Sequence, residues 1–176
     1  MTIRKCFIGL AIASIFVMSI WFLGSVSQAT AETLNCRFFN QQTKAEAVPI
    51  PDVEGHVIRL TIREGVQIFE NGEMAPTKQV LYNDLIKAAG PIETYTIITF
   101  QDGSTIVTHT KGRVETTPEG LQTTSKFTGD IIHGTGRFQG IKGTYATSSK
   151  ILPPEKGESS GKSIGEGTYV YTLPSK

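Results

Sequence analysis

Apolar and polar residues alternate along several short segments after residue 32, a pattern typical of β-strands with two unlike faces. The clearest case is residues 55–63, where the two alternating sets are His56, Ile58, Leu60 and Ile62 on one face and Val57, Arg59, Thr61 and Arg63 on the other. A period of two sustained over this length predicts a half-buried strand.

Turn signals separate further extended segments. Asn71-Gly72 and Asp102-Gly103 each join two of them, and such pairs favour tight hairpins because both residues tolerate positive φ. The other predicted strands are 33–40, 66–70, 92–100, 104–111, 121–132, 142–147 and 164–173, with loops at 41–51 and 153–163. Roughly eight short strands without a long helix predict an all-β domain. A closed antiparallel barrel leaves no exposed edge, and a two-sheet β-sandwich is the alternative.

Residues 77–89 fit two patterns. Leu81, Leu85 and Ala88 lie at helical spacing before Gly90-Pro91, which would end a helix. The same segment also alternates with period two, and extended segments flank it on both sides. We therefore predict a strand here.

The first 31 residues follow a different pattern. Arg4 and Lys5 precede an uncharged stretch at 6–26, and Ala29-Thr30-Ala31 matches the small-residue site that signal peptidase cleaves. This order predicts a signal peptide at 1–31, a barrel domain at 32–176, and a secreted or periplasmic protein. The uncharged stretch is about as long as the ~20 residues that cross a bilayer. An uncleaved anchor, touching the membrane only through residues 6–26, is the alternative.

Removal of residues 1–31 changes the chemistry of the chain. It takes away Arg4 and Lys5 and no acid, so 15 basic residues face 16 acidic ones and the net charge becomes −1. A nearly neutral domain without a basic patch gives no reason to expect nucleic acid as a partner. Cys6 and the only tryptophan, Trp21, are also lost, which leaves Cys36 without an internal disulfide partner.

Four glycines form the most unusual local pattern. Gly134, Gly136, Gly140 and Gly143 surround Phe138. A phosphate-binding loop would need a helix directly after such a turn, whereas the segment that follows is predicted to be a strand. Glycines of this kind instead mark bends and close backbone approaches in a barrel wall. We predict that Phe138 plugs the interior.

The string Gly134-Thr135-Gly136-Arg137-Phe138, with Gly140 and Gly143-Thr144-Tyr145, resembles the G-T-G-x-F-x-G/A-x-x-G stretch of allene oxide cyclase and dirigent-type barrels. It is especially similar to their bacterial relatives, the allene oxide cyclase barrel-like domains. The resemblance implies a calycin-like, eight-stranded antiparallel barrel with an apolar cavity. In the plant cyclases this cavity isomerises a fatty-acid epoxide, and in dirigent proteins it orients phenolic radicals. We carry no catalytic residue of either family over to this chain.

Candidate catalytic and metal-binding residues are isolated in the sequence. His56, His109 and His133 lack partners at the spacing of a zinc site, so no metal and no cofactor is expected. No Gly-x-Ser-x-Gly motif occurs, and Cys36 is expected to behave as a small buried apolar residue. The catalytic residues, if the protein is an enzyme, stay unknown.

A semi-polar cavity wall is the remaining candidate site. Small-molecule sites combine apolar walls with a few fixed polar groups, and the residues that we place at such a wall are Tyr82, Tyr95, His109 and Arg59. We predict an exported barrel that binds a small, largely apolar molecule. The alternatives are an isomerase or cyclase acting on a lipid-derived or phenolic substrate, and a non-catalytic envelope protein; assembly into a homo-oligomer stays open.

Overall fold

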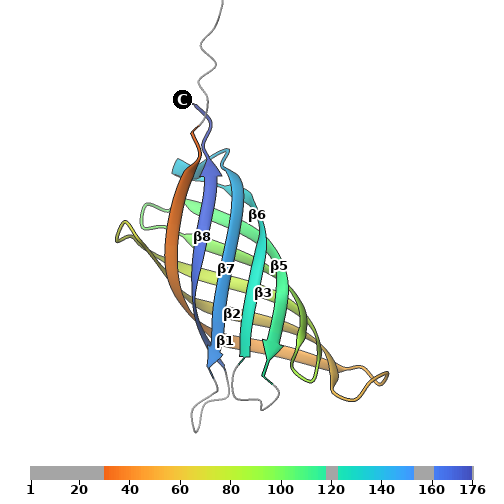
Figure 1. The fold of residues 1–176 in the computed structure, drawn as a ribbon. Helices are drawn as coiled ribbons and strands as arrows, with labels where there is room; N and C mark the ends of the chain where they lie inside the picture. The colour runs from red at the N-terminus through yellow and green to blue at the C-terminus, as the bar shows by residue number, and fades with distance from the viewer. Residues whose placement is uncertain (1–29, 118–122, 153–160, 176) are drawn as a thin grey trace, which may run out of the picture.

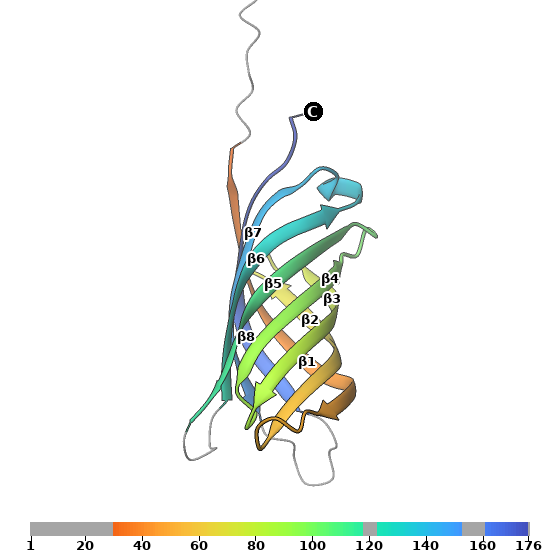
Figure 2. The same ribbon diagram turned by 90° about the vertical axis from the view of Figure 1, so that its right-hand side faces the viewer.

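The computed structural model describes residues 30–117, 123–152 and 161–175, and it shows a closed barrel of eight antiparallel strands (Figures 1 and 2). The strands are β1 (Glu32–Pro49), β2 (His56–Phe69), β3 (Met74–Ile86), β4 (Gly90–Thr99), β5 (Thr105–Thr116), β6 (Thr123–Gly134), β7 (Lys142–Leu152) and β8 (Lys162–Thr172). Each strand pairs with its neighbours in the chain, and β1 pairs with β8 to close the ring. The predicted barrel is confirmed, and the sandwich is excluded.

The predicted signal peptide and its cleavage site at Ala31 fall largely outside the described residues, which begin at Thr30. No helix in the described part of the chain is long and apolar enough to span a bilayer.

Both predicted tight turns are present. Gly72 has a φ of +84° and Gly103 a φ of +81°, values that favour glycine, and they join β2 to β3 and β4 to β5. The segment 77–89 is mostly strand, as β3 extends to Ile86. Sequence analysis was wrong about residues 41–51, because β1 continues to Pro49 and pairs with β2 from Cys36 to Pro49. Proline is tolerated there since it ends the strand.

The upper end of the barrel, where both described termini lie (Figure 1), is filled by apolar side chains. This upper core consists of Cys36, Phe69, Ala75, Ile98, Phe100, Ile106, Ile131, Phe138, Ile141, Tyr145, Tyr169 and Tyr171. Its rings stack closely, with centroids 5.4 Å apart for Phe69 and Phe100 and 4.2 Å apart for Tyr145 and Tyr169. Aromatic pairs in this range add to the free energy gained by burial.

The glycine-rich string forms the turn that caps this core. A short 3-10 helix, η1 (Gly136–Phe138), connects β6 to β7, and it directs Phe138 into the core. Gly136 and Gly140 have positive φ, at +59° and +77°. A Cβ on Gly134 would lie 2.3 Å from the carbonyl oxygen of Phe138, so the close approach of η1 to β6 requires glycine there.

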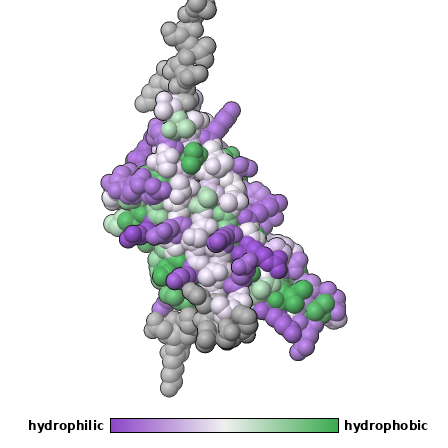
Figure 3. Space-filling model, in the orientation of Figure 1, coloured by the Kyte–Doolittle hydropathy of each residue, from purple (hydrophilic) through white to green (hydrophobic). Residues whose placement is uncertain are grey.

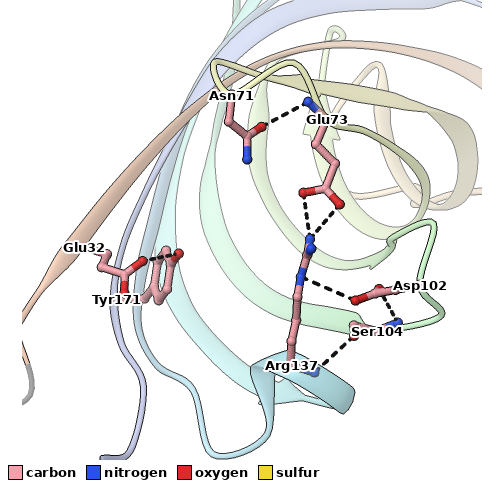
Figure 4. A network of polar contacts seen from close by, with 7 residues as sticks. All are labelled: Glu32, Asn71, Glu73, Asp102, Ser104, Arg137 and Tyr171. Atoms are coloured by element: carbon pink, nitrogen blue, oxygen red, sulfur yellow. Dashed lines mark hydrogen bonds and ion pairs between the residues drawn. The ribbon is translucent and has the colours of Figure 1, made fainter.

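Arg137 ties the upper turns together (Figure 4). Its Nη2 lies 2.7 Å from both carboxylate oxygens of Glu73, and its Nε lies 3.7 Å from Oδ2 of Asp102. Its guanidinium also lies over the rings of Phe100 and Phe138, at 4.7 and 4.8 Å from their centroids. One side chain thus links η1 to the β2–β3 and β4–β5 turns and closes this end of the barrel.

The outer face of the barrel differs between its two sides. Over β7 and β8 it carries small and hydroxylated residues between charged side chains, visible as the pale strip in Figure 3. Around Ser148 this strip holds a shallow depression of about 550 Å³, bounded by Arg37, Lys126 and Lys150. On β2, β3 and β4 the outer face is apolar, with Leu60 49% exposed.

Candidate functional site

A small chamber lies inside the barrel between two apolar clusters. It has a volume of about 20 Å³ and is bounded by Tyr145 of the upper core. On the opposite side Leu81 and Phe127 belong to a lower cluster that also contains Ile92 and Val114. The polar residues that line the chamber are Asn40, Arg63, Gln79, Thr94, Thr96, Thr110, Thr147, Ser149 and Ser163. The chamber is therefore a polar pocket within the barrel interior.

Arg63 dominates the electrostatics of this chamber. Burial lowers the pKa of its guanidinium to about 10, and repulsion from Arg59 lowers it further in the same direction. The group still carries its positive charge at neutral pH. None of the residues lining the chamber is Asp, Glu or His, and Arg63 has no ion pair with any described residue. By accessible area Arg63 is half-buried, and it is a cation without an ion pair among the described residues.

Three donor atoms facing this region lack hydrogen-bond partners. They are Nε of Arg63, Oγ1 of Thr94 and Oγ of Ser163, and each belongs to a residue that lines the chamber. Thr94 is only 4% exposed and Ser163 only 2%. Buried polar atoms in native proteins nearly always have partners, so these three atoms are where a bound water or a ligand atom could be accommodated.

Some of the remaining polar side chains nearby pair with one another, but the hydroxyl of Thr108, across from Thr96, is also buried without a partner. The Asn40 amide oxygen accepts a hydrogen bond from the Thr77 hydroxyl at 3.0 Å, and Gln79 donates to Thr96 at 3.3 Å. At the lower side, Arg59 donates to the Gln42 amide oxygen at 2.6 Å.

The alternation of β2 explains how Arg63 reaches the interior. Val57, Arg59, Thr61 and Arg63 form the set that faces inward, as the burial of Thr61 at 2% exposure shows. The apolar set of the same strand, which includes Leu60, faces outward. The strand is two-faced as predicted, but its polar face lines the barrel.

Only one of the four predicted ligand-binding residues lies on the inner face. Arg59 points inward beside Arg63. Tyr82 and Tyr95 are 49% and 46% exposed on the outside, and His109 joins them there, stacked on Tyr95 with ring centroids 4.3 Å apart. The structure thus differs from the prediction that all four share one cavity wall.

The alternation of inner and outer residues along β4 explains why Tyr95 and His109 lie on the outside. Thr94 and Thr96 face inward at 4% and 1% exposure, so Tyr95 between them faces outward. Cross-strand pairing then places His109 beside Tyr95, where it also contacts the Glu93 carboxylate. Periodicity identifies residues that share a face, but neither face of this hairpin is apolar enough to identify the buried one.

Sequence analysis missed Arg63, Thr94 and Ser163 as site residues. One signal was present, because Arg63 shares its predicted strand face with Arg59. Thr94 and Ser163 carry no such signal, since isolated hydroxyl residues are common on strands. Only the closure of the barrel brings β2, β4 and β8 around one cavity.

Three weak acids lie in the upper core. Burial raises the pKa of the Cys36 thiol to about 11, and it also raises the pKa values of Tyr145 and Tyr169. These groups therefore stay protonated, and their hydroxyl and thiol protons serve packing and hydrogen bonding. Across residues 30–117, 123–152 and 161–175, no cluster of three or more His, Cys, Asp or Glu side chains could hold a metal ion.

Comparison with known proteins gives matches in structure alone. No protein-family model matches the sequence, and no curated protein matches it. Among solved structures, the chain is similar to the pterocarpan synthase dirigent protein GePTS1, with 11% identity and a TM-score of 0.49 over 83% of this chain and 93% of that one. The pterocarpan synthase dirigent protein PsPTS1 matches with 11% identity and a TM-score of 0.47, over 84% of this chain and 99% of that one.

Both matches are dirigent proteins, the barrel group that the glycine-rich string resembles. At this identity the similarity concerns the barrel fold alone. Pterocarpan synthesis is the activity named in the descriptions of those two proteins. The chamber around Arg63 has to be interpreted from its own residues.

Proposed function

We propose that the protein is an exported barrel that binds a small organic acid in its chamber, with the acidic group paired to Arg63. The observation that supports this most strongly is the half-buried guanidinium of Arg63, which lines the chamber and has no ion pair among the described residues. A buried charge without a partner costs several kcal/mol, and a ligand that supplies the negative charge would recover part of that cost.

The apolar part of the ligand would contact the rings that border the chamber. Phe38 and Phe127 line it and are half-buried, so they have space to turn aside when a molecule larger than the present cavity enters. The upper end is closed by η1 and Arg137. Entry would therefore be from the lower end, past the side chains of the lower cluster and Arg59, whose positive charge would attract an acid toward Arg63.

Binding of matched acids and alcohols tests this proposal. Sodium benzoate and benzyl alcohol, and octanoate and octanol, are titrated by calorimetry into the purified full-length protein in a Tris buffer that contains no other carboxylate. We expect saturable binding of the acids and at least about tenfold weaker binding of the alcohols, since a charged hydrogen bond contributes about 1.5–3 kcal/mol.

Two variants test the role of Arg63, one in the chamber and one as a control on the outer face. Arg63→Gln should remove the preference for the acid, whereas Arg37→Gln removes the same charge from the outer face and should keep it. Absence of saturable acid binding to the unmodified protein would reject the proposal and favour a structural role for the barrel.

A further inference from the structure

A continuous apolar patch covers the outer wall of the barrel from β2 to β5. Its outward-facing side chains lie opposite one another across neighbouring strands. We call this set the outer patch, and it consists of Leu60, Ile62, Val80, Tyr82, Tyr95, Ile97, Val107 and His109. Scattered apolar residues are normal on a protein surface, whereas a contiguous patch usually marks a contact surface.

The side chains of the outer patch are exposed to a similar degree. Leu60 and Tyr82 are each 49% exposed, and Tyr95 and Ile97 are 46% and 42% exposed. A fully covered aromatic side chain buries about 150–250 Å², so the two half-exposed tyrosines alone offer roughly 200 Å². With the aliphatic members and the surrounding rim, the outer patch approaches the ~800 Å² per partner of a stable protein–protein interface.

The opposite wall of the barrel is different. The outward positions of β8 are Ile164, Glu166, Thr168 and Val170, so charged and hydroxyl side chains separate the apolar ones. On β7 the corresponding positions are hydroxyl, alanine and lysine side chains. An apolar contact between two copies of this chain would therefore use the outer patch on both, which is an isologous arrangement with twofold symmetry.

The rim of the outer patch carries charges of both signs. On β1, Lys44 lies opposite Ile62 and Glu46 lies opposite Leu60. On the far side, Glu93 lies opposite Lys111. A mixed rim can match acid to lysine across a twofold axis. An anionic lipid surface would repel the acids as strongly as it attracts the lysines, so the charge pattern favours protein over lipid.

The aromatic part of the outer patch is held in place before any contact forms. The rings of Tyr95 and His109 stack with their centroids 4.3 Å apart and their planes 8° apart. His109 also contacts the carboxylate of Glu93. Side chains that are already ordered lose little conformational entropy on binding, which favours association.

From the continuity of the outer patch, its one-sided position and its mixed rim, we infer that the protein forms a twofold dimer in which the outer patches of two copies face each other. The inference is independent of the proposed function, because the outer patch faces away from the chamber. It also gives a role to Tyr82, Tyr95 and His109, which lie together on the outside.

Sedimentation velocity of the full-length protein tests the inference. Between about 1 and 100 µM protein, the average mass should rise from one chain and level off at two, since interfaces of standard size reach at least micromolar affinity. A single chain throughout, or a mass that levels off at three chains or more, would overturn it. If the protein stays a monomer and floats with phosphatidylglycerol vesicles only while Leu60 is intact, the outer patch contacts lipid instead.

Matched variants locate the interface. Leu60→Glu should weaken the dimer at least about a hundredfold, because twofold symmetry places two carboxylates in the apolar contact. Val170→Glu, at a residue 42% exposed on the opposite wall, should leave the dimer unchanged. Circular dichroism verifies that both variants fold. Equal association of the two variants would mean that another segment joins the copies, and it would reject the inference.

Disulfide cross-linking gives a second test that does not weaken the contact. Val80 lies near the centre of the outer patch, where a twofold axis brings a residue close to its own copy. In a Cys6→Ser background, Val80→Cys should form a linked dimer under mild oxidation much faster than Val170→Cys. Equal rates of linkage in the two variants would contradict the twofold contact.

Discussion

The upper core and the chamber are built on the same strands and differ in almost every physical property. Along the inner face of β4, Thr94 and Thr96 belong to the chamber region, while Ile98 and, just after the strand, Phe100 belong to the upper core. The upper core is apolar and closely stacked. The chamber holds an unpaired cation and orphaned hydroxyls. One region supplies stability, and the other departs from the rules that stabilise interiors, as binding sites commonly do.

The largest expected change in the free energy of unfolding follows from removing one ring of the upper core. Phe69→Ala removes a ring that is 2% exposed and stacked on Phe100, and we expect a loss of about 3–5 kcal/mol in the free energy of unfolding. Urea unfolding monitored by circular dichroism measures it. The control is Ile68→Ala, the next residue on the outer face, with an expected change within about 0.5 kcal/mol. Equal effects of the two substitutions would contradict the assignment of the upper core.

Substitution of the charged residue in the chamber should raise the free energy of unfolding, whereas substitution in the upper core lowers it. Arg63→Met removes a half-buried charge without an ion-pair partner among the described residues, and we expect it to stabilise the protein by about 1–3 kcal/mol. Arg37→Met, on the outer face, should change stability little. A clear loss of stability in Arg63→Met, measured by the same urea titration, would mean that Arg63 is a structural residue.

The smallest effect concerns pH at the lower rim, outside both regions. Hydrogen bonds to Asp52 and then Asp84 raise the pKa of His56, with its Nδ1 2.6 Å from Asp52 and its Nε2 2.8 Å from Asp84. Because the folded pKa is the higher one, this contribution is fully present below the unfolded pKa near 6.5 and is lost as pH rises through the folded value. His56→Gln should flatten the dependence of the unfolding midpoint on pH from about 6 to 8. An unchanged slope would show that these contacts do not contribute.

The barrel was predictable because its signals are local. The Asn71-Gly72 and Asp102-Gly103 turns, the alternating segments and the glycine-rich string each depend on a few neighbouring residues. The site was only partly predictable. Arg59 was placed at an inner wall and lies there, but Tyr82, Tyr95 and His109 lie outside, because alternation by itself leaves the direction of each face open.

The sequence by itself determined that the chain forms eight short antiparallel strands with tight turns, and that each strand has two unlike faces. The tertiary structure decided which face is inside, because the apolar set of β2 faces outward while Arg59 and Arg63 face inward. It also decided that Arg63, Thr94 and Ser163, from three strands distant in sequence, surround one cavity. Closure of the ring between β1 and β8 is a long-range event, and a pattern of period two contains no information about it.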